Sequence, residues 1–143
     1  MRLPVKAGHL PQRIAAGAFI LNAGIGKLSA NEETAARLHK MATGTYPFLG
    51  KLEPKDFARL LAVSEVALGA ALLLPVVPSA VAGAGLAAFS GVLLGLYART
   101  PGMHKENSPF PTQQGTPLAK DVWMLGIALG LVIDDLAGRS ERD

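Results

Sequence analysis

The sequence of 143 residues contains no cysteine, which excludes disulfide bonds, thiolate metal sites, iron–sulfur clusters and redox dithiols from this chain. Charged residues are scarce: Asp, Glu, Lys and Arg make up 17% of the chain, against about a quarter in a typical soluble domain. Apolar residues make up 50%, so little polar surface is left to hydrate a compact fold. Any redox role would need chemistry that is housed in another molecule.

Motifs for catalysis and for nucleotide binding are missing as well. No serine lies in a G-x-S-x-G context, and no glycine-rich phosphate loop occurs. His9, His39 and His104 lack metal-ligand spacing, so we expect ordinary surface histidines and no metal site. The net charge is +3, but no basic run is present, so we expect no nucleic-acid partner. Catalysis by this chain alone is not expected.

The longest feature of the sequence is the stretch 66–98, whose 33 residues include no Asp, Glu, Lys, Arg or His. It exceeds the roughly 20 residues that cross a bilayer as a helix. Pro75 and Pro78 divide it near its centre, because proline ends helices. The pattern therefore predicts two transmembrane helices, at about 56–74 and 79–98, joined by a tight turn.

Two shorter apolar stretches predict further spans at about 10–28 and 117–137. The expected fold is all-α: a single integral membrane domain over 1–143, built as a bundle of four transmembrane helices. Arg13 and Lys27 have long stems that reach toward the headgroups. Between the first two spans, residues 29–32 (Ser-Ala-Asn-Glu) have the form of a capping box, which predicts a short interfacial helix at about 30–43.

Small residues recur at every fourth position of the span 79–98, and the last span repeats this spacing. Such stripes let helix backbones approach closely in lipid. We therefore predict tight packing between helices of one bundle, and a self-dimerisation face is the less favoured alternative. The residues are Ser79, Gly83, Ala87, Gly91 and Gly95 in the third span, with Gly126 and Gly130 in the fourth.

Several charged residues are predicted to meet in one half of the bundle, because the chain runs up and down through four spans. Glu65 lies well inside the second span, where an unpaired carboxylate is costly. Lys27 is the cation nearest to it in depth. The predicted buried polar cluster consists of Asn22, Lys27, Glu65, Arg99, Lys120 and Asp121. Whether it locks the helices together or forms a functional site is left open by the sequence.

These features resemble the DoxX family of small four-span membrane proteins. The resemblance lies in the segment 13–28, in Glu65-x-x-x-Gly69 followed by the Leu-Leu-Leu-Pro run at 72–75, and in Lys120-Asp121 followed by 124–126. It covers most of residues 10–137. The resemblance implies an accessory or scaffold subunit in the inner (plasma) membrane that associates with a membrane oxidoreductase or respiratory system. A quinone is the cofactor that it would contact.

The expected partners are the lipid bilayer and membrane or peripheral proteins, with a homo-oligomer as a further option. An alternative function is a small proton-coupled transporter or carrier in which Glu65 changes protonation. A soluble helical bundle is disfavoured because the stretch 66–98 offers no polar face. The orientation in the membrane stays unassigned, because the lysines and arginines of the two sides give conflicting signals.

Overall fold

The computed structural model describes residues 5–99, 108, 112 and 121–140, and these described residues form helices and no strand. The all-α prediction is therefore confirmed at this level. The two short 3₁₀ helices are η1 (Ala7–His9) and η2 (Pro47–Lys51). The α-helices are α1 (Leu10–Leu28), α2 (Glu32–Thr45), α3 (Pro54–Leu73), α4 (Ser79–Arg99) and α6 (Asp121–Ser140).

The starts of the helices follow from local residue chemistry. Both α1 and α3 have proline in the first turn, where its missing N–H costs nothing. Helix α2 is capped by Asn31, whose side chain accepts a hydrogen bond from the backbone N–H of Thr34 at 2.8 Å. The predicted cap at Ser29 is wrong, because the Ser29 hydroxyl instead donates to the carbonyl of Gly26 at the end of α1.

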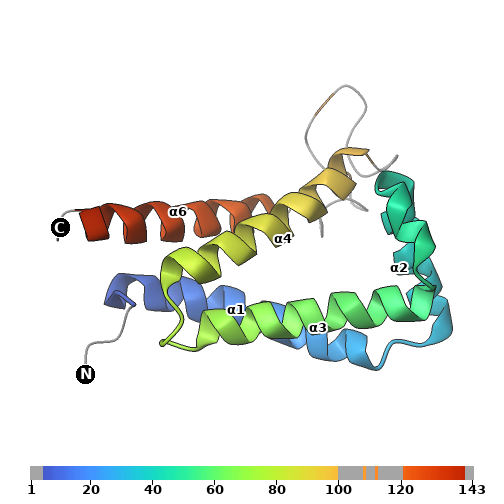
Figure 1. Ribbon diagram of the computed structural model, residues 1–143, viewed down its shortest axis with the longest axis horizontal. Helices are drawn as coiled ribbons and strands as arrows, with labels where there is room; N and C mark the ends of the chain where they lie inside the picture. Colours follow the sequence, from blue (N-terminus) through green and yellow to red (C-terminus); the bar gives the residue numbers. More distant parts are fainter. Residues whose placement is uncertain (1–4, 100–107, 109–111, 113–120, 141–143) are drawn as a thin grey trace.

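Two helix pairs form the two arms of a V (Figure 1). Helix α1 packs along α3 in one arm, α4 packs along α6 in the other, and α3 and α4 touch little. The arms meet at the turn that contains Pro75 and Pro78, and they diverge toward α2, which lies across the open end (Figure 1). The polar segment between the first two apolar helices therefore bridges the mouth of the V.

Close approach within each arm depends on glycines. An ideal Cβ placed on Gly69 of α3 would lie 2.7 Å from the backbone nitrogen of Leu21 in α1, and one on Gly24 would lie 2.8 Å from the nitrogen of Val66. In the other arm, a Cβ on Gly83 would lie 2.9 Å from the carbonyl oxygen of Ala128. These positions have no room for any side chain.

The small-residue prediction was only partly right. Gly83 is a contact residue, but Gly91 and Gly126 are exposed and an added Cβ would meet nothing within 4 Å. The same is true of Gly130. In the first arm, whose glycines were not part of that prediction, Gly24 and Gly69 allow the close contact of α1 with α3.

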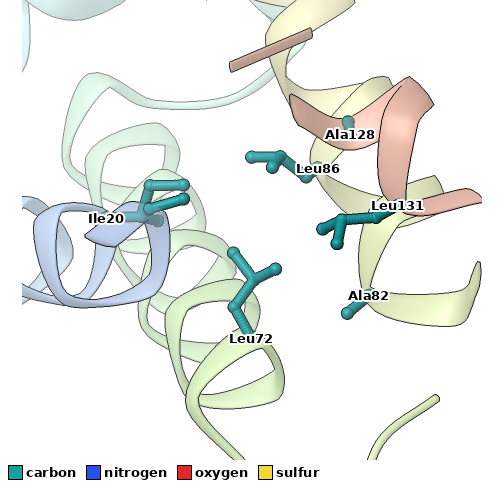
Figure 2. Close-up of a cluster of buried hydrophobic side chains, with 7 residues drawn as sticks. Ile20, Leu72, Ala82, Leu86, Ala128 and Leu131 are labelled. Carbon is teal, nitrogen blue, oxygen red and sulfur yellow. The ribbon is translucent and has the colours of Figure 1, made fainter. Parts of the chain in front are cut away.

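The apolar core lies where the two arms come together. Ile20 and Leu72 from the first arm point toward Leu86 and Leu131 from the second (Figure 2). Leu72, Leu86 and Leu131 are each at most 1% exposed. These leucines therefore hold the arms together near the turn, while the arms separate beyond them.

By length and composition, α4 alone among the described helices is apolar enough to cross a membrane. The helices otherwise follow the expected ranges closely: α1 covers 10–28, α3 begins two residues before the expected span, and α2 begins and ends two residues later than expected. Residues 117–120 of the expected fourth span lie outside the described residues.

We predict that Gly69→Ala destabilises the protein by about 1–3 kcal/mol, because the new methyl group overlaps the backbone of α1. Gly91→Ala is the matched control: it lies in α4 with open space around it, so it should be neutral or stabilising by up to about 1 kcal/mol through helix propensity. Unfolding of both variants in detergent measures the difference. Equal stability of the two variants would contradict this close packing of α1 on α3.

Candidate functional site

A cavity of about 330 Å³ lies between the two arms, on the side where they diverge. Every α-helix contributes to its wall, and the wall is mostly apolar. The lining residues are Phe19, Ile20, Ala23 and Lys27 of α1; Leu38, Met41 and Ala42 of α2; Tyr46 at the end of α2 and Leu49 of η2; Phe57, Leu61 and Glu65 of α3; Phe89, Val92, Leu93 and Leu96 of α4; and Asp121 and Met124 of α6. The volume is in the range of small-molecule sites.

Three charged side chains, which we call the cavity cluster, line this space: Lys27, Glu65 and Asp121. The structure places Lys27 Nζ 3.0 Å from Glu65 Oε2, and the Glu65 side chain is only 6% exposed. Asp121 is close enough to Glu65 for the two carboxyl groups to act on each other electrostatically. The cluster thus joins α1 and α3 through an ion pair and adds a second carboxyl group from α6.

The other residues of the predicted polar cluster do not belong to this group. Asn22 and Arg99 are both exposed, so their predicted burial is wrong. Asn22 is five residues before Lys27, which rotates it by about 140° around the helix and away from the cavity. Arg99 is the last residue of α4, beyond the last cavity-lining turn. Lys120 lies outside the described residues.

Tyr46 closes the cavity at the open end of the V. Its hydroxyl donates a hydrogen bond to the carbonyl of Val92 in α4 at 2.8 Å. A Cβ on Gly95 would overlap this hydroxyl, so glycine at that position makes room for the tyrosine. Gly95 therefore serves the contact between α4 and the end of α2, and not the helix–helix packing that its spacing suggested.

A second polar group, which we call the Arg13 cluster, lies at the closed end of the V. Arg13 is 1% exposed and donates five hydrogen bonds. Four go to carbonyl oxygens at the end of α3 and in the following turn, at 2.7–3.0 Å. The fifth goes to the hydroxyl of Ser79 at 3.1 Å. All five guanidinium N–H groups are thus used.

The Arg13 cluster also ties α6 to the rest of the molecule. His9 contacts Ser79 Oγ at 2.8 Å through Nδ1 and Asp134 Oδ2 at 2.7 Å through Nε2. Asp135 accepts a hydrogen bond from the N–H of Ala80 at 2.8 Å, in the first turn of α4. Arg13 and His9 were expected at the surface, and both expectations are wrong, since His9 is 5% exposed.

A signal for this cluster was present in the sequence. The carbonyls of Ala71 and Leu74 would normally accept from the N–H groups four residues later, and those positions are Pro75 and Pro78. Arg13 Nη2 donates to these two carbonyls. The Leu74 carbonyl also accepts from the N–H of Val77 at 3.2 Å, so the Ala71 carbonyl is the acceptor that a proline leaves without its helical donor and that the buried arginine satisfies.

The two polar groups differ in what they can do chemically. The hydrogen bonds of the Arg13 cluster connect helices and turns, which suits a structural role. The cavity cluster instead borders an open volume that a ligand could enter. No set of three His, Cys, Asp or Glu side chains suited to a metal ion occurs among the described residues. No family model, curated protein or solved structure matches this chain.

We predict that Arg13→Lys destabilises the protein by at least about 3 kcal/mol, because lysine cannot reproduce the planar five-donor fork and several buried carbonyls lose their partners. Arg59→Lys, at an exposed position of α3, is the control and should change stability by less than about 0.5 kcal/mol. Thermal or denaturant unfolding in detergent compares them. An Arg13→Lys variant as stable as the control would show that these hydrogen bonds are dispensable.

For the cavity cluster, removal of either partner of the ion pair should cost more than removal of both. Lys27→Met strands the buried Glu65 carboxylate and Glu65→Gln strands the ammonium, at about 3–5 kcal/mol for a fully buried pair and less here because Lys27 is partly exposed. A double-mutant cycle measures the coupling directly. Additive effects of the two substitutions would mean that the pair contributes no interaction energy.

Proposed function

We propose that this chain is a four-span membrane protein that resembles the DoxX family and acts as an accessory or scaffold subunit of a membrane oxidoreductase. Its expected location is the inner (plasma) membrane, and its expected small-molecule ligand is a quinone in the cavity between the arms. The observation that supports the proposal most strongly is the placement of residues by polarity. Arg13, Glu65 and Asp135 are buried inside the molecule, while many large apolar side chains lie on its outside.

The outward apolar residues occur on every long helix. Eighteen large apolar side chains of the described residues are exposed by more than a third, far beyond the isolated examples that a soluble surface carries. They include Ile14 and Ile25 of α1, Leu60 and Val63 of α3, Val81 of α4, and Trp123, Leu129, Ile133 and Leu136 of α6. Arg13, Glu65 and Asp135 are at most 5% exposed. Lipid is the solvent that suits this arrangement.

The charged residues of α1 and α3 explain why these helices look less apolar than α4. Arg13 and Glu65 lower the mean hydropathy of their helices, but both side chains point into the molecule and are hydrogen-bonded there. In α4 itself, only 33% of the apolar window is buried, whereas a core helix of a soluble protein would be mostly buried. These facts support lipid contact along several helices, including those with inward charges.

The cavity supports a binding role in preference to a proton-coupled carrier. Its wall is apolar, and its polar groups are confined to the cavity cluster, which suits a ring with a small polar edge. Glu65 is held by Lys27 at 3.0 Å, so this carboxyl group already joins α3 to α1 as a structural ion pair. A small proton-coupled carrier that uses the buried Glu65 is the second candidate.

Fractionation and gentle extraction test the proposal. We expect the full chain to stay in the membrane pellet after carbonate treatment, and to co-purify with quinone and with oxidoreductase subunits after mild detergent extraction. Release by carbonate would contradict the membrane assignment. Retention in the membrane without quinone or partners, together with proton-dependent flux in vesicles that contain only this chain, would replace the accessory role with the carrier.

A further inference from the structure

We propose that the cavity between the arms selects small aromatic or aliphatic ligands that carry a positive charge, with Asp121 as the group that recognises the charge. This inference rests on the same cavity as the proposed function and names the chemistry of its ligand. It depends on the charges and rings that line the cavity and not on the identity of the wider complex.

The charges of the cavity cluster do not balance. Among the described lining residues, two carboxyl groups (Glu65 and Asp121) face one ammonium group (Lys27). Lys27 is already within 3.0 Å of Glu65. Asp121 forms no hydrogen bond or ion pair with a described residue, and it experiences Glu65 as a repelling neighbour. Among the described lining residues, Asp121 is therefore the carboxyl group without a cationic partner, and a cationic ligand would supply one.

The apolar wall adds a second attraction for a cation. Four aromatic rings line the cavity: Phe19, Tyr46, Phe57 and Phe89. The face of an aromatic ring attracts a cation, and more strongly where water is excluded. A ligand with an apolar body and a cationic head would bury its body against these rings and place its head beside Asp121. A neutral ligand of the same shape gains only the burial of its apolar body.

Hydrogen-bond donors are also limited at this site. The hydroxyl of Tyr46 is engaged with the carbonyl of Val92, so it is not free to donate to a ligand. Lys27 keeps N–H groups beyond the one that it gives to Glu65, but they are next to that carboxylate. A carboxylate or phosphate ligand would meet two like charges at the same place. The site thus disfavours anions and gives neutral acceptors few partners.

The test compares two ligands of the same shape, benzyltrimethylammonium and its uncharged carbon isostere neopentylbenzene. Binding is measured by calorimetry with the full chain in nanodiscs, and partitioning is corrected with nanodiscs that contain no protein. We expect the cation to bind about tenfold more tightly than the isostere, as one partly desolvated ion pair with ring contacts provides. Equal or tighter binding of the isostere would overturn the proposal.

Two isosteric variants identify the recognising group. Asp121→Asn should reduce the preference for the cation to less than about threefold while it leaves isostere binding unchanged, because only the charge is lost. Asp56→Asn, the matched control, makes the same change in net charge at an exposed position that does not line the cavity, and it should keep the full preference. Retention of the full preference in Asp121→Asn would contradict the role of Asp121.

A short-chain benzoquinone in the same assay separates this inference from the proposed function. Cation preference without benzoquinone binding supports the inference and removes the quinone from the proposed function. Benzoquinone binding together with no cation preference would overturn the inference and support the quinone of the proposed function. Should Asp121→Asn fail to fold, as judged by loss of isostere binding, the comparison of the two ligands on the unsubstituted chain still decides the proposal.

Discussion

Satisfaction of backbone carbonyls at the end of α3 is the constraint on which the rest of the structure depends. Proline residues make the sharp turn between the arms, and Pro75 also removes the N–H group that the carbonyl of Ala71 in α3 would use. Arg13 of α1 donates to this carbonyl and to three others at the end of α3 and in the turn. Because the same guanidinium reaches Ser79 at the start of α4, a single side chain fixes the position where both arms begin.

The cavity is a consequence of this fixed end. Arg13, His9 and the acidic pair of α6 hold the arms together at the turn, and the leucines beside them complete the contact. Farther along, glycines bring α1 against α3 and α4 against α6, but α3 and α4 touch little. The arms therefore diverge, and α2 with Tyr46 covers the space between them. Close contact of the arms at one end thus leaves a cavity between them at the other.

Much of the helix content could be predicted from the sequence, because it depends on local signals such as prolines and uncharged stretches. The nearness of Lys27 and Glu65 could also be predicted, because a chain that runs up and down through four spans places both residues in the same half of the bundle. The glycine contacts could not be predicted from their spacing. Positions four apart advance by about 40° beyond a full turn, so the stripe from Gly83 to Gly95 winds around α4. Gly83 therefore faces α6, Gly91 is exposed, and Gly95 meets Tyr46.

Burial of Arg13 was missed for a different reason. Long cationic side chains near the end of a span are usually assigned to the headgroups, and this assignment considers one helix at a time. Two of the carbonyls that Arg13 contacts, those of Ala71 and Leu72, belong to α3, and Leu72 lies 59 residues later in the sequence. A sequence argument finds such a partner only when it lists the acceptors that prolines leave without donors.

The central claim is that Arg13, Glu65 and Asp135 are kept inside and that lipid surrounds the apolar outside of all four long helices. Because the chain has no cysteine, single cysteines for spin labels can be introduced directly at Ile14, Leu60, Val81 and Ile133, with Glu33 of α2 as the water-exposed control. Accessibility in bilayers to oxygen and to a water-soluble nickel chelate is the most direct measurement. The account predicts high oxygen and low nickel accessibility at all four positions, and the reverse at Glu33. Protection from nickel at Val81 alone would leave α4 as a single span and contradict the account.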